Sequence, residues 1–369
     1  MIQSRAAVCH RANQPMTIET VEVEGPKAGE VLVEVKATGV CHTDAVIFWG
    51  INANSPLPAV LGHEGAGVVV EVGPEVTTVR PGDHVVPLYG AECGVCRQCR
   101  SGRTNICWST RGTRDRGVLP EGTSRFRLNG APIHHFMGTS TFSRYTVAAE
   151  VAVAKIRPDL PFAEACLLGC GVTTGVGAAM QDTRAGDTVA VFGLGGVGIN
   201  IVQGARAASA ERIIGIDPNP MKRDLARRFG ATDLVDPAPL GATLVAAIVE
   251  MTKGGVDVSF ESSGELDVMR QAFECTCLGW GTCVLLGVEP DGTEIGVRPV
   301  MVRYGRTLKG SYFGGVKGRS ELGRYADMLA NGTITVDGLV SHTLPIDDVN
   351  RAFDLMRSGE SSRTVLLHG

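Results

Sequence analysis

Residues that could hold a catalytic metal ion occur at three places in the first half of the chain: Cys41, His63 and Cys170. Two thiolates and one imidazole leave the fourth position of a tetrahedral zinc site open to water or substrate. An open zinc ion lowers the pKa of an alcohol, so that an alkoxide forms near neutral pH and its carbon can release hydride to a nicotinamide. Each residue alone is equally compatible with an ordinary core position, so the prediction rests on the other motifs found with them.

Two acidic residues accompany these candidate ligands. Asp44 is a natural acceptor for the second ring nitrogen of His63, which would fix the tautomer of that ring. Glu64 follows His63 directly and could support the metal site or act as an exchangeable ligand. We therefore expect both carboxylates to lie at the catalytic centre.

Four further cysteines follow the spacing Cys93-x-x-Cys96-x-x-Cys99-x7-Cys107. Four thiolates can close a tetrahedron around zinc without leaving a position for substrate, which predicts a structural role. The segment around them, residues 90–145, shows little apolar periodicity, and metal–ligand bonds can hold such a lobe in place of a core. An iron–sulfur cluster and buried free thiols remain the alternatives.

A glycine-rich turn supplies the third chemical signal. Gly193-x-Gly195-x-x-Gly198 lies between a predicted buried strand and an apolar helix, and Asp217 closes the next predicted strand. Such a turn lets the backbone approach a pyrophosphate at a helix N-terminus, while the acid binds the adenosine ribose and repels a 2′-phosphate. NAD is therefore the expected cofactor. The residues of this predicted site are Gly193, Gly195, Gly196, Val197, Gly198 and Asp217.

The elements that must position these residues fall into two patterns. Up to about residue 89 the sequence is β-rich, with alternating stretches and Gly or Pro turns. From about residue 158 strands alternate with helices such as Pro220–Phe229, which predicts a parallel, doubly wound sheet. After Phe313 we expect helices at Leu322–Leu329 and Ile346–Ser358 and a last strand at Arg363–Leu367, packing back on the first domain. The strands expected in the sheet are Val189–Phe192, Ile213–Asp217, Leu234–Val235, Val256–Glu261, Cys283–Gly287 and Leu308–Phe313.

Composition excludes several classes of function. The length of 369 residues fits about two domains, and a net charge of −4 gives no reason to expect nucleic acid or an anionic membrane as partner. No apolar run is long enough to span a bilayer, and no secretion signal is evident at the N-terminus. Eleven cysteines then favour metal ligands and buried thiols over disulfides, and we expect a cytoplasmic protein.

These motifs together resemble the zinc-dependent medium-chain alcohol dehydrogenases, and within them the class III, glutathione-dependent formaldehyde dehydrogenases. The resemblance implies an α/β fold with a GroES-like β-rich catalytic domain and a doubly wound parallel-sheet (Rossmann) cofactor domain. It implies NAD, two zinc ions per chain and a homodimer. The stretches that carry it are Gly39–Ala45, Leu61–Gly67, the Cys93 lobe, Gly122–Phe126, Met137–Ser143, Leu167–Gly171 and Arg363–Val365.

The resemblance also assigns roles to individual residues. Thr43 matches the hydroxyl that takes the substrate proton and passes it toward the nicotinamide ribose, a relay that needs no strong base. His42 matches a catalytic position that also contacts the cofactor, and Lys222 matches the partner of Asp217 at the ribose. The positions matching cofactor contacts are His42, Thr174, Lys222 and Arg363.

The substrate pocket departs from the class III pattern. An acidic pair that holds glutathione there is replaced by Asn52 and Asn54, and a lysine by Leu278, whereas the anion-binding arginine is matched by Arg111. Fewer paired charges predict weaker recognition of a zwitterionic peptide. Primary alcohols, aromatic ones among them, are therefore the expected substrates, with Phe48, Trp49 and Arg111 in the pocket. S-(hydroxymethyl)glutathione or another thiol adduct of formaldehyde is the first alternative, and a non-catalytic zinc-binding relative is the second.

The expected domain boundaries follow from these assignments. Residues 1–170 form the catalytic domain with its zinc lobe at about 90–110, residues 171–312 the NAD-binding domain, and residues 313–369 the return to the first domain. The expected partners are a small alcohol or aldehyde and a second copy of the chain, with neither nucleic acid nor membrane.

Overall fold

The computed structural model describes residues 1–51, 55–290 and 292–369, so the predicted pocket positions Asn52 and Asn54 lie outside the described residues. The chain forms two compact units. The first combines Met1–Cys170 with Lys317–Gly369, and the second is Gly171–Val316.

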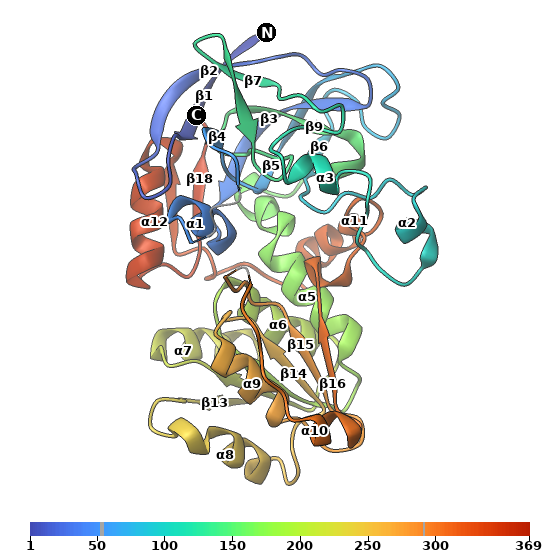
Figure 1. Ribbon diagram of the computed structural model, residues 1–369, viewed down its shortest axis with the longest axis vertical. Coiled ribbons are helices and arrows are strands. Elements are labelled where there is room, and N and C mark those ends of the chain that lie inside the picture. The colour runs from blue at the N-terminus through green and yellow to red at the C-terminus, as the bar shows by residue number, and fades with distance from the viewer. Residues whose placement is uncertain (52–54, 291) are drawn as a thin grey trace. The chain divides into compact units, whose positions relative to one another are not determined.

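The first unit is built on two β-structures (Figure 1). Strands β1, β2, β7, β8 and β4 close a barrel in that order, and a sheet of order β10-β6-β5-β3-β18-β17 carries β9 as a further neighbour of β3. Short strands divided by Gly and Pro turns explain why the N-terminal sequence alternates without helical periodicity. The strands are β1 (Ile2–Cys9), β2 (Thr17–Val23), β3 (Glu30–Gly39), β4 (Ala59–Val60), β5 (Glu64–Val72), β6 (His84–Pro87), β7 (Phe126–Leu128), β8 (Ala131–His135), β9 (Tyr145–Ala149), β10 (Val153–Lys155), β17 (His342–Pro345) and β18 (Thr364–Leu367).

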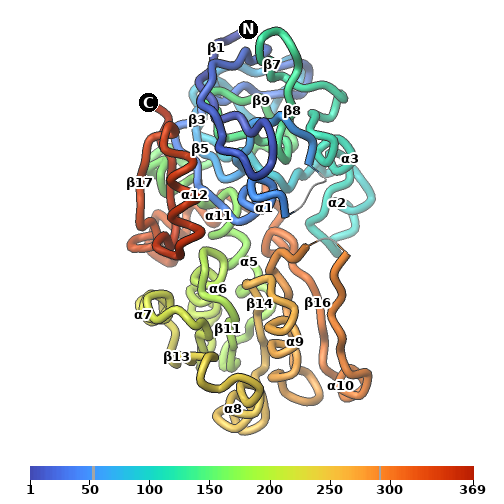
Figure 2. The backbone as a smooth tube through the Cα atoms, turned by 60° about the vertical axis from the view of Figure 1, so that its left-hand side comes forward, coloured from blue at the N-terminus to red at the C-terminus, as the bar shows by residue number. Residues whose placement is uncertain are grey.

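The C-terminal segment completes this unit. Strand β18 pairs antiparallel with β3, Val365 opposite Gly39, so the last strand supports the strand that leads into the first candidate ligand. Figure 2 shows the C-terminal segment of this unit in red, with β17 and α12 labelled. Phe353 of the last helix lies in the same hydrophobic core as Val8, Leu61 and Phe142. The helices of this unit are α1 (His42–Phe48), α2 (Arg97–Ser101), α3 (Arg111–Arg114), η1 (Glu150–Ala152), α4 (Phe162–Ala165), η2 (Cys166–Gly169), α11 (Gly318–Ala330), η5 (Ile346–Asp348) and α12 (Val349–Ser358).

The second unit is a six-stranded, all-parallel sheet of order β13-β12-β11-β14-β15-β16. Helices alternate with the strands, so the predicted doubly wound sheet is confirmed (Figure 1). Central strands buried on both faces explain the continuous apolar runs in the sequence. The elements are α5 (Gly171–Asp182), β11 (Thr188–Phe192), α6 (Gly196–Ala207), β12 (Arg212–Ile216), α7 (Pro220–Phe229), β13 (Asp233–Val235), η3 (Gly241–Thr243), α8 (Leu244–Met251), β14 (Val258–Glu261), α9 (Leu266–Glu274), β15 (Thr282–Leu285), α10 (Pro299–Arg303), β16 (Thr307–Gly310) and η4 (Phe313–Gly315).

In the described part of the chain no single helix is both long and apolar enough to cross a bilayer, although the interrupted pair Phe162–Gly169 and Gly171–Asp182 passes by length and composition.

Candidate metal and cofactor sites

The three predicted catalytic ligands are brought together in the first unit. Ligand atoms of Cys41, His63, Glu64 and Cys170 all lie within 4.8 Å of one another, and all four residues are buried. Cys41 is the N-cap of α1, directly after β3, and His63 precedes β5. The end of β3, the start of β5 and two short helical segments thus bring residues that are distant in the sequence to one point.

Asp44 determines how His63 faces that point. The Asp44 carboxylate accepts hydrogen bonds from His63 Nδ1 at 3.0 Å, Gly62 N at 3.1 Å and Cys41 N at 3.2 Å. With its proton on Nδ1, the ring presents an unprotonated Nε2, and this atom is buried without a hydrogen-bond partner among the described residues. A buried nitrogen lone pair beside two thiols fits a zinc ion.

Glu64 forms a buried ion pair at the same site. Arg363 Nη2 contacts both carboxylate oxygens of Glu64, across nearly the whole length of the chain. Burial raises the pKa of Glu64 to about 7, against the opposing charge of Arg363. The predicted contact of Arg363 with the cofactor stays a prediction, because the structure shows only its pairing with Glu64.

The thiol of Cys41 is poised for ionisation. Its pKa is lowered well below the usual range by a hydrogen bond from Cys170, and the charge of Arg363 acts in the same direction against burial. A thiolate is the form that binds a metal ion. The electrostatics of the site therefore favour a cation between the two sulfur atoms.

Two aromatic side chains at this centre were not predicted. The ring of Tyr89 lies 5.6 Å from that of His63, and the ring of Phe136 lies 6.1 Å from it, both in edge-on orientation. Cys170 Sγ lies 3.9 Å from the Tyr89 hydroxyl oxygen. No motif marks either residue, because each reaches the centre only through the closure of the β-structures around His63.

The residues next to Cys41 remain predictions in their assigned roles. Cys41 Sγ lies 3.9 Å from Thr43 Oγ1, so the predicted proton-relay hydroxyl lies close to a predicted ligand. His42 is exposed, and its ring makes an edge-on contact with Trp49 at 5.9 Å. The first turn of α1 thus carries Thr43 and His42 at the rim of the candidate metal centre.

The predicted pocket residues make contacts of another kind. Phe48 stacks on Phe353 of α12 with ring centroids 4.8 Å apart, and the Arg357 guanidinium lies 4.7 Å above the Trp49 ring. Both aromatic residues thereby pack α1 against α12. Arg111 is exposed at the first position of α3. Their assignment to a substrate pocket stays a prediction.

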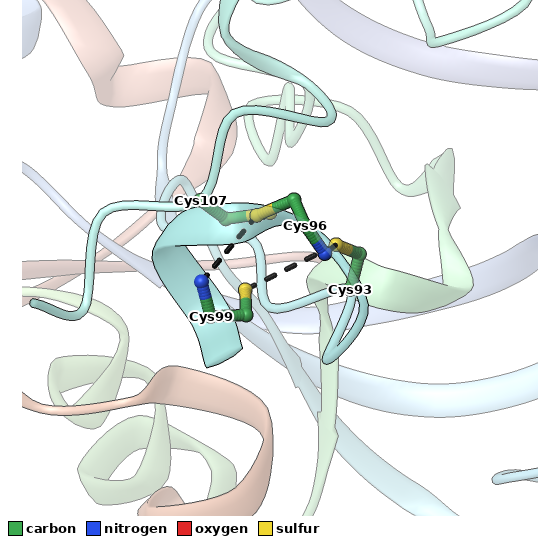
Figure 3. Close-up of side chains that lie close together, drawn as sticks. All are labelled: Cys93, Cys96, Cys99 and Cys107. Atoms are coloured by element: carbon green, nitrogen blue, oxygen red, sulfur yellow. Dashed lines mark hydrogen bonds between the residues drawn. The ribbon is translucent and has the colours of Figure 1, made fainter. Parts of the chain in front are cut away.

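The four-cysteine motif forms a second cluster, shown in Figure 3. Cys93 and Cys99 Sγ are 3.9 Å apart, and Cys96 and Cys107 Sγ are 4.0 Å apart. A zinc tetrahedron with bonds of about 2.3 Å has edges of about 3.8 Å, so these two distances fit a zinc site.

The backbone also supports this cluster. Cys93 Sγ accepts from Cys96 N at 3.3 Å, and Cys96 Sγ accepts from Cys99 N at 3.4 Å. Backbone N–H groups of Trp108 and Cys99 lower the pKa of Cys96 to about 6, whereas burial raises that of Cys99 to about 12. A cation would supply the charge that lets all four thiols ionise together.

The glycine-rich turn joins β11 to α6 in the second unit. Gly193 has φ of +84°, and a Cβ atom on Gly198 would lie 1.8 Å from the Gly193 carbonyl oxygen, so both positions require glycine. A Cβ on Gly195 would meet no heavy atom within 4 Å, which leaves open space over the turn. A pyrophosphate fits there, at the N-terminus of α6.

Asp217 lies at the end of β12, beside this turn. Its Oδ2 accepts from Leu194 N and its Oδ1 from Asn219 N, both at 2.8 Å. Thr174 Oγ1, on α5, is buried without a partner among the described residues. Lys222 lies half-buried near the start of α7. These positions are compatible with the predicted ribose and cofactor contacts but do not test them.

Comparisons with known proteins agree with this geometry. The family described as "Alcohol dehydrogenase GroES-like domain" matches residues 27–161, and that described as "Zinc-binding dehydrogenase" matches residues 196–331. An S-(hydroxymethyl)glutathione dehydrogenase of Escherichia coli is 52% identical over 99% of this chain and 100% of its own length. An alcohol dehydrogenase class-3 of Cereibacter sphaeroides is 49% identical, with the same coverage.

Solved structures show the same likeness over the full length. A zinc-binding-domain alcohol dehydrogenase protein of Burkholderia ambifaria superposes with a TM-score of 0.93 at 35% identity, covering 99% of both chains. Benzyl alcohol dehydrogenase of Acinetobacter calcoaceticus gives a TM-score of 0.92 at 29% identity, covering 100% of both chains.

Proposed function

The chain belongs to the zinc-dependent medium-chain alcohol dehydrogenases, with a GroES-like and a Rossmann-type domain, and we propose that within this family it is an NAD-dependent S-(hydroxymethyl)glutathione dehydrogenase. The sequence alone favoured primary alcohols and kept this thiol adduct as an alternative. The names of the relatives at 52% and 49% identity favour the alternative.

The observation that carries the chemistry is the orphaned Nε2 atom of His63, buried beside the thiols of Cys41 and Cys170. When bound, a zinc ion supplies the Lewis acidity that lowers the pKa of the substrate hydroxyl. In this proposal Asp44 keeps His63 in the ligating tautomer, and Thr43 takes the hydroxyl proton of the substrate while passing its own proton on toward the nicotinamide ribose. NAD, held by the glycine-rich turn and Asp217, would supply the acceptor for hydride from the substrate carbon.

Substrate selection depends on Arg111 in this proposal. An exposed guanidinium with no carboxylate partner among the described residues can bind a carboxylate of the glutathione moiety. Because two carboxylates and an ammonium of the class III pattern are replaced here, we expect weaker adduct binding than in relatives that keep them. Aromatic primary alcohols are the second candidate, supported by the full-length likeness to benzyl alcohol dehydrogenase.

Initial rates of NAD reduction distinguish the two candidates. Formaldehyde should be oxidised only when glutathione is present, and a benzyl-type alcohol should be a poorer substrate. R111Q should raise KM for the adduct about tenfold and leave the benzyl-type alcohol unaffected, since a charge-assisted hydrogen bond is worth about 1.5 kcal/mol. R116Q, which removes another exposed arginine of the same segment, is the matched control. Thiol-independent turnover of the aromatic alcohol alone would instead establish the second candidate.

The cofactor and compartment belong to the same proposal. NAD is preferred to NADP because the Asp217 carboxylate would repel a 2′-phosphate. All eleven cysteines are free, which suits a reducing cytoplasm. A non-catalytic relative would have no use for an open metal centre, so finding fewer than two zinc ions per chain would favour that reading.

A homodimer is the proposed assembly. Strand β16 is the last strand in the order of the parallel sheet, and Val300, Val302 and Tyr304 are exposed beside it. An unpaired edge with adjoining apolar side chains can pair with the same edge of a second copy. Light scattering should give a dimer for the wild type and a monomer for Y304D.

A further inference from the structure

The turn that follows β14 contacts the glycine-rich turn that follows β11. The two strands are parallel neighbours, with Phe192 opposite Glu261, so both turns emerge at the same edge of the sheet. Ser262 N donates to Phe192 O at 2.9 Å. The Ser262 hydroxyl lies 2.8 Å from Gly193 O and 3.2 Å from Phe192 O. A side chain outside the glycine motif therefore bonds to the motif's first residue.

The bond to Gly193 O fixes one particular peptide unit. The carbonyl of Gly193 and the N–H of Leu194 belong to the same planar peptide group. Its oxygen accepts from Ser262 Oγ, and its N–H donates to Asp217 Oδ2 at 2.8 Å. Ser262 and Asp217 thus hold this peptide from opposite ends, and its plane sets the direction in which the turn continues into Gly195.

The backbone at Gly193 does little by itself to prevent rotation of this peptide. Gly193 adopts a positive φ that costs glycine nothing but also restricts it little. The Gly193 oxygen packs so closely on the first turn of α6 that a Cβ on Gly198 would lie 1.8 Å away. A small rotation of the peptide would therefore shift the N-terminus of α6, where the pyrophosphate is expected.

Glu261 supports the residue that makes the bond. Its side chain is fully buried, and Oε1 accepts from Ser263 N at 2.6 Å, Ser263 Oγ at 2.5 Å and Gly264 N at 3.0 Å. The Glu261 carbonyl in turn accepts from Leu286 N at 2.8 Å. These bonds fix the Ser262–Gly264 turn against β14 and the residue that follows β15. The position of the Ser262 hydroxyl is therefore set by the turn that carries it.

We infer that Ser262 is a positioning residue for the dinucleotide: together with Asp217 it clamps the Gly193–Leu194 peptide in the orientation that binds pyrophosphate, and Glu261 fixes the turn that carries it. This inference rests on the NAD function proposed above. Ser262 acts on the diphosphate end of the cofactor and not on the reacting atoms. Its removal should therefore weaken binding of any ligand that carries the adenosine diphosphate moiety and leave kcat unchanged.

Ser259, on β14 just before the turn that carries Ser262, provides a matched control. Its buried hydroxyl donates to Ala272 O at 2.6 Å, at the end of α9 and away from the glycine turn. S259A and S262A each remove one hydroxyl that bonds a backbone carbonyl. Both should lower thermal stability, but only S262A should change cofactor affinity.

Titrations of NADH by fluorescence and of ADP-ribose by calorimetry measure binding without turnover. We expect S262A to raise Kd for both ligands about fivefold, the factor that corresponds to about 1 kcal/mol for one hydrogen bond. S259A should stay within about twofold of the wild type, and S262T, which keeps the hydroxyl, should restore affinity. In steady-state assays S262A should raise KM for NAD at constant kcat.

Three results would overturn the inference in distinguishable ways. Wild-type protein that binds ADP-ribose, with S262A binding it equally well, refutes the clamp alone. A loss of affinity in S259A as large as that in S262A also refutes it, because the effect would then follow general destabilisation. Wild-type protein that binds neither NADH nor ADP-ribose refutes the proposed cofactor, and the inference fails with it.

Discussion

Replacing Asp44 with asparagine should release the catalytic metal while leaving the four-cysteine site intact. Asp44 is fully buried and accepts three hydrogen bonds, two at Oδ1 from His63 Nδ1 and Gly62 N and one at Oδ2 from Cys41 N. Asparagine has the same shape but only one acceptor atom. No orientation of the amide can therefore reproduce all three bonds.

The two orientations of the amide fail for different reasons. If its oxygen faces His63 and Gly62, the NH₂ group opposes Cys41 N–H, and one buried donor stays unsatisfied at a cost of about 1–3 kcal/mol. If its NH₂ group faces His63, Nδ1 must become an acceptor and the proton moves to Nε2, which then cannot bind a metal ion. Either way we expect zinc affinity to fall about 10- to 100-fold.

Competition with a chromophoric chelator measures this loss directly. D44N should give up one zinc ion at a chelator concentration at which the wild type keeps two, and the remaining ion, at the four cysteines, is the internal control. If D44N bound both zinc ions as tightly as the wild type does, Asp44 would not be needed to orient His63, and the reasoning would be refuted.

Three further perturbations test other parts of the molecule. C99S should remove only the structural zinc and make the lobe around α2 sensitive to proteolysis, because three thiolates no longer close the tetrahedron; limited proteolysis with metal analysis checks this, and an intact lobe would contradict it. D217A should raise Kd for NADH about tenfold and reduce discrimination against NADPH, measured by fluorescence titration; unchanged discrimination would exclude Asp217 as the selecting residue. Burial lowers the pKa of His135 to about 3 and of His368 to about 4, so the unfolded chain binds protons near pH 6.5 that the folded chain does not, and stability falls as pH drops below that value. When the pH is lowered from 7 to 5, the free energy of unfolding measured in urea titrations should fall by about 2 kcal/mol less in H135Q than in the wild type. If the free energy fell equally in both proteins, His135 would not be the group that causes the loss.

The parallel sheet could be predicted closely because its signal is local. Helix α7 spans Pro220–Phe229 as expected, with Asn219 as N-cap and Gly230 in the left-handed region at its end. Strand β12 (Arg212–Ile216) is shifted by one residue from the expected Ile213–Asp217. Apolar runs, a cap and a terminating glycine are properties of a few consecutive residues, so the sequence displays them directly.

The clustering of the candidate metal ligands could be predicted for a different reason. Cysteine and histidine carry distinctive chemistry, so Cys41, His63 and Cys170 could be proposed before their proximity was known. Their surroundings could not be. The pairing of Glu64 with Arg363 and the position of Tyr89 beside His63 depend on contacts between distant segments, and neither residue type signals such a contact.

The packing of Phe48 and Trp49, two residues of the expected substrate pocket, could not be predicted. Their large aromatic side chains follow the first candidate ligand in the sequence, which favours a place in the pocket. In the structure they pack against α12, from the other end of the chain. The C-terminal segment creates this contact when it packs back on the first unit, and the sequence near α1 does not predict it.

Metal analysis of the wild type and of H63A, combined with the rate of NAD reduction, tests whether a catalytic zinc ion binds at His63. We expect two zinc ions per wild-type chain and one in H63A, and we expect H63A to lose formaldehyde oxidation in the presence of glutathione. A wild-type chain with a single zinc ion, or H63A with both ions and full activity, would contradict a catalytic metal at Cys41, His63 and Cys170.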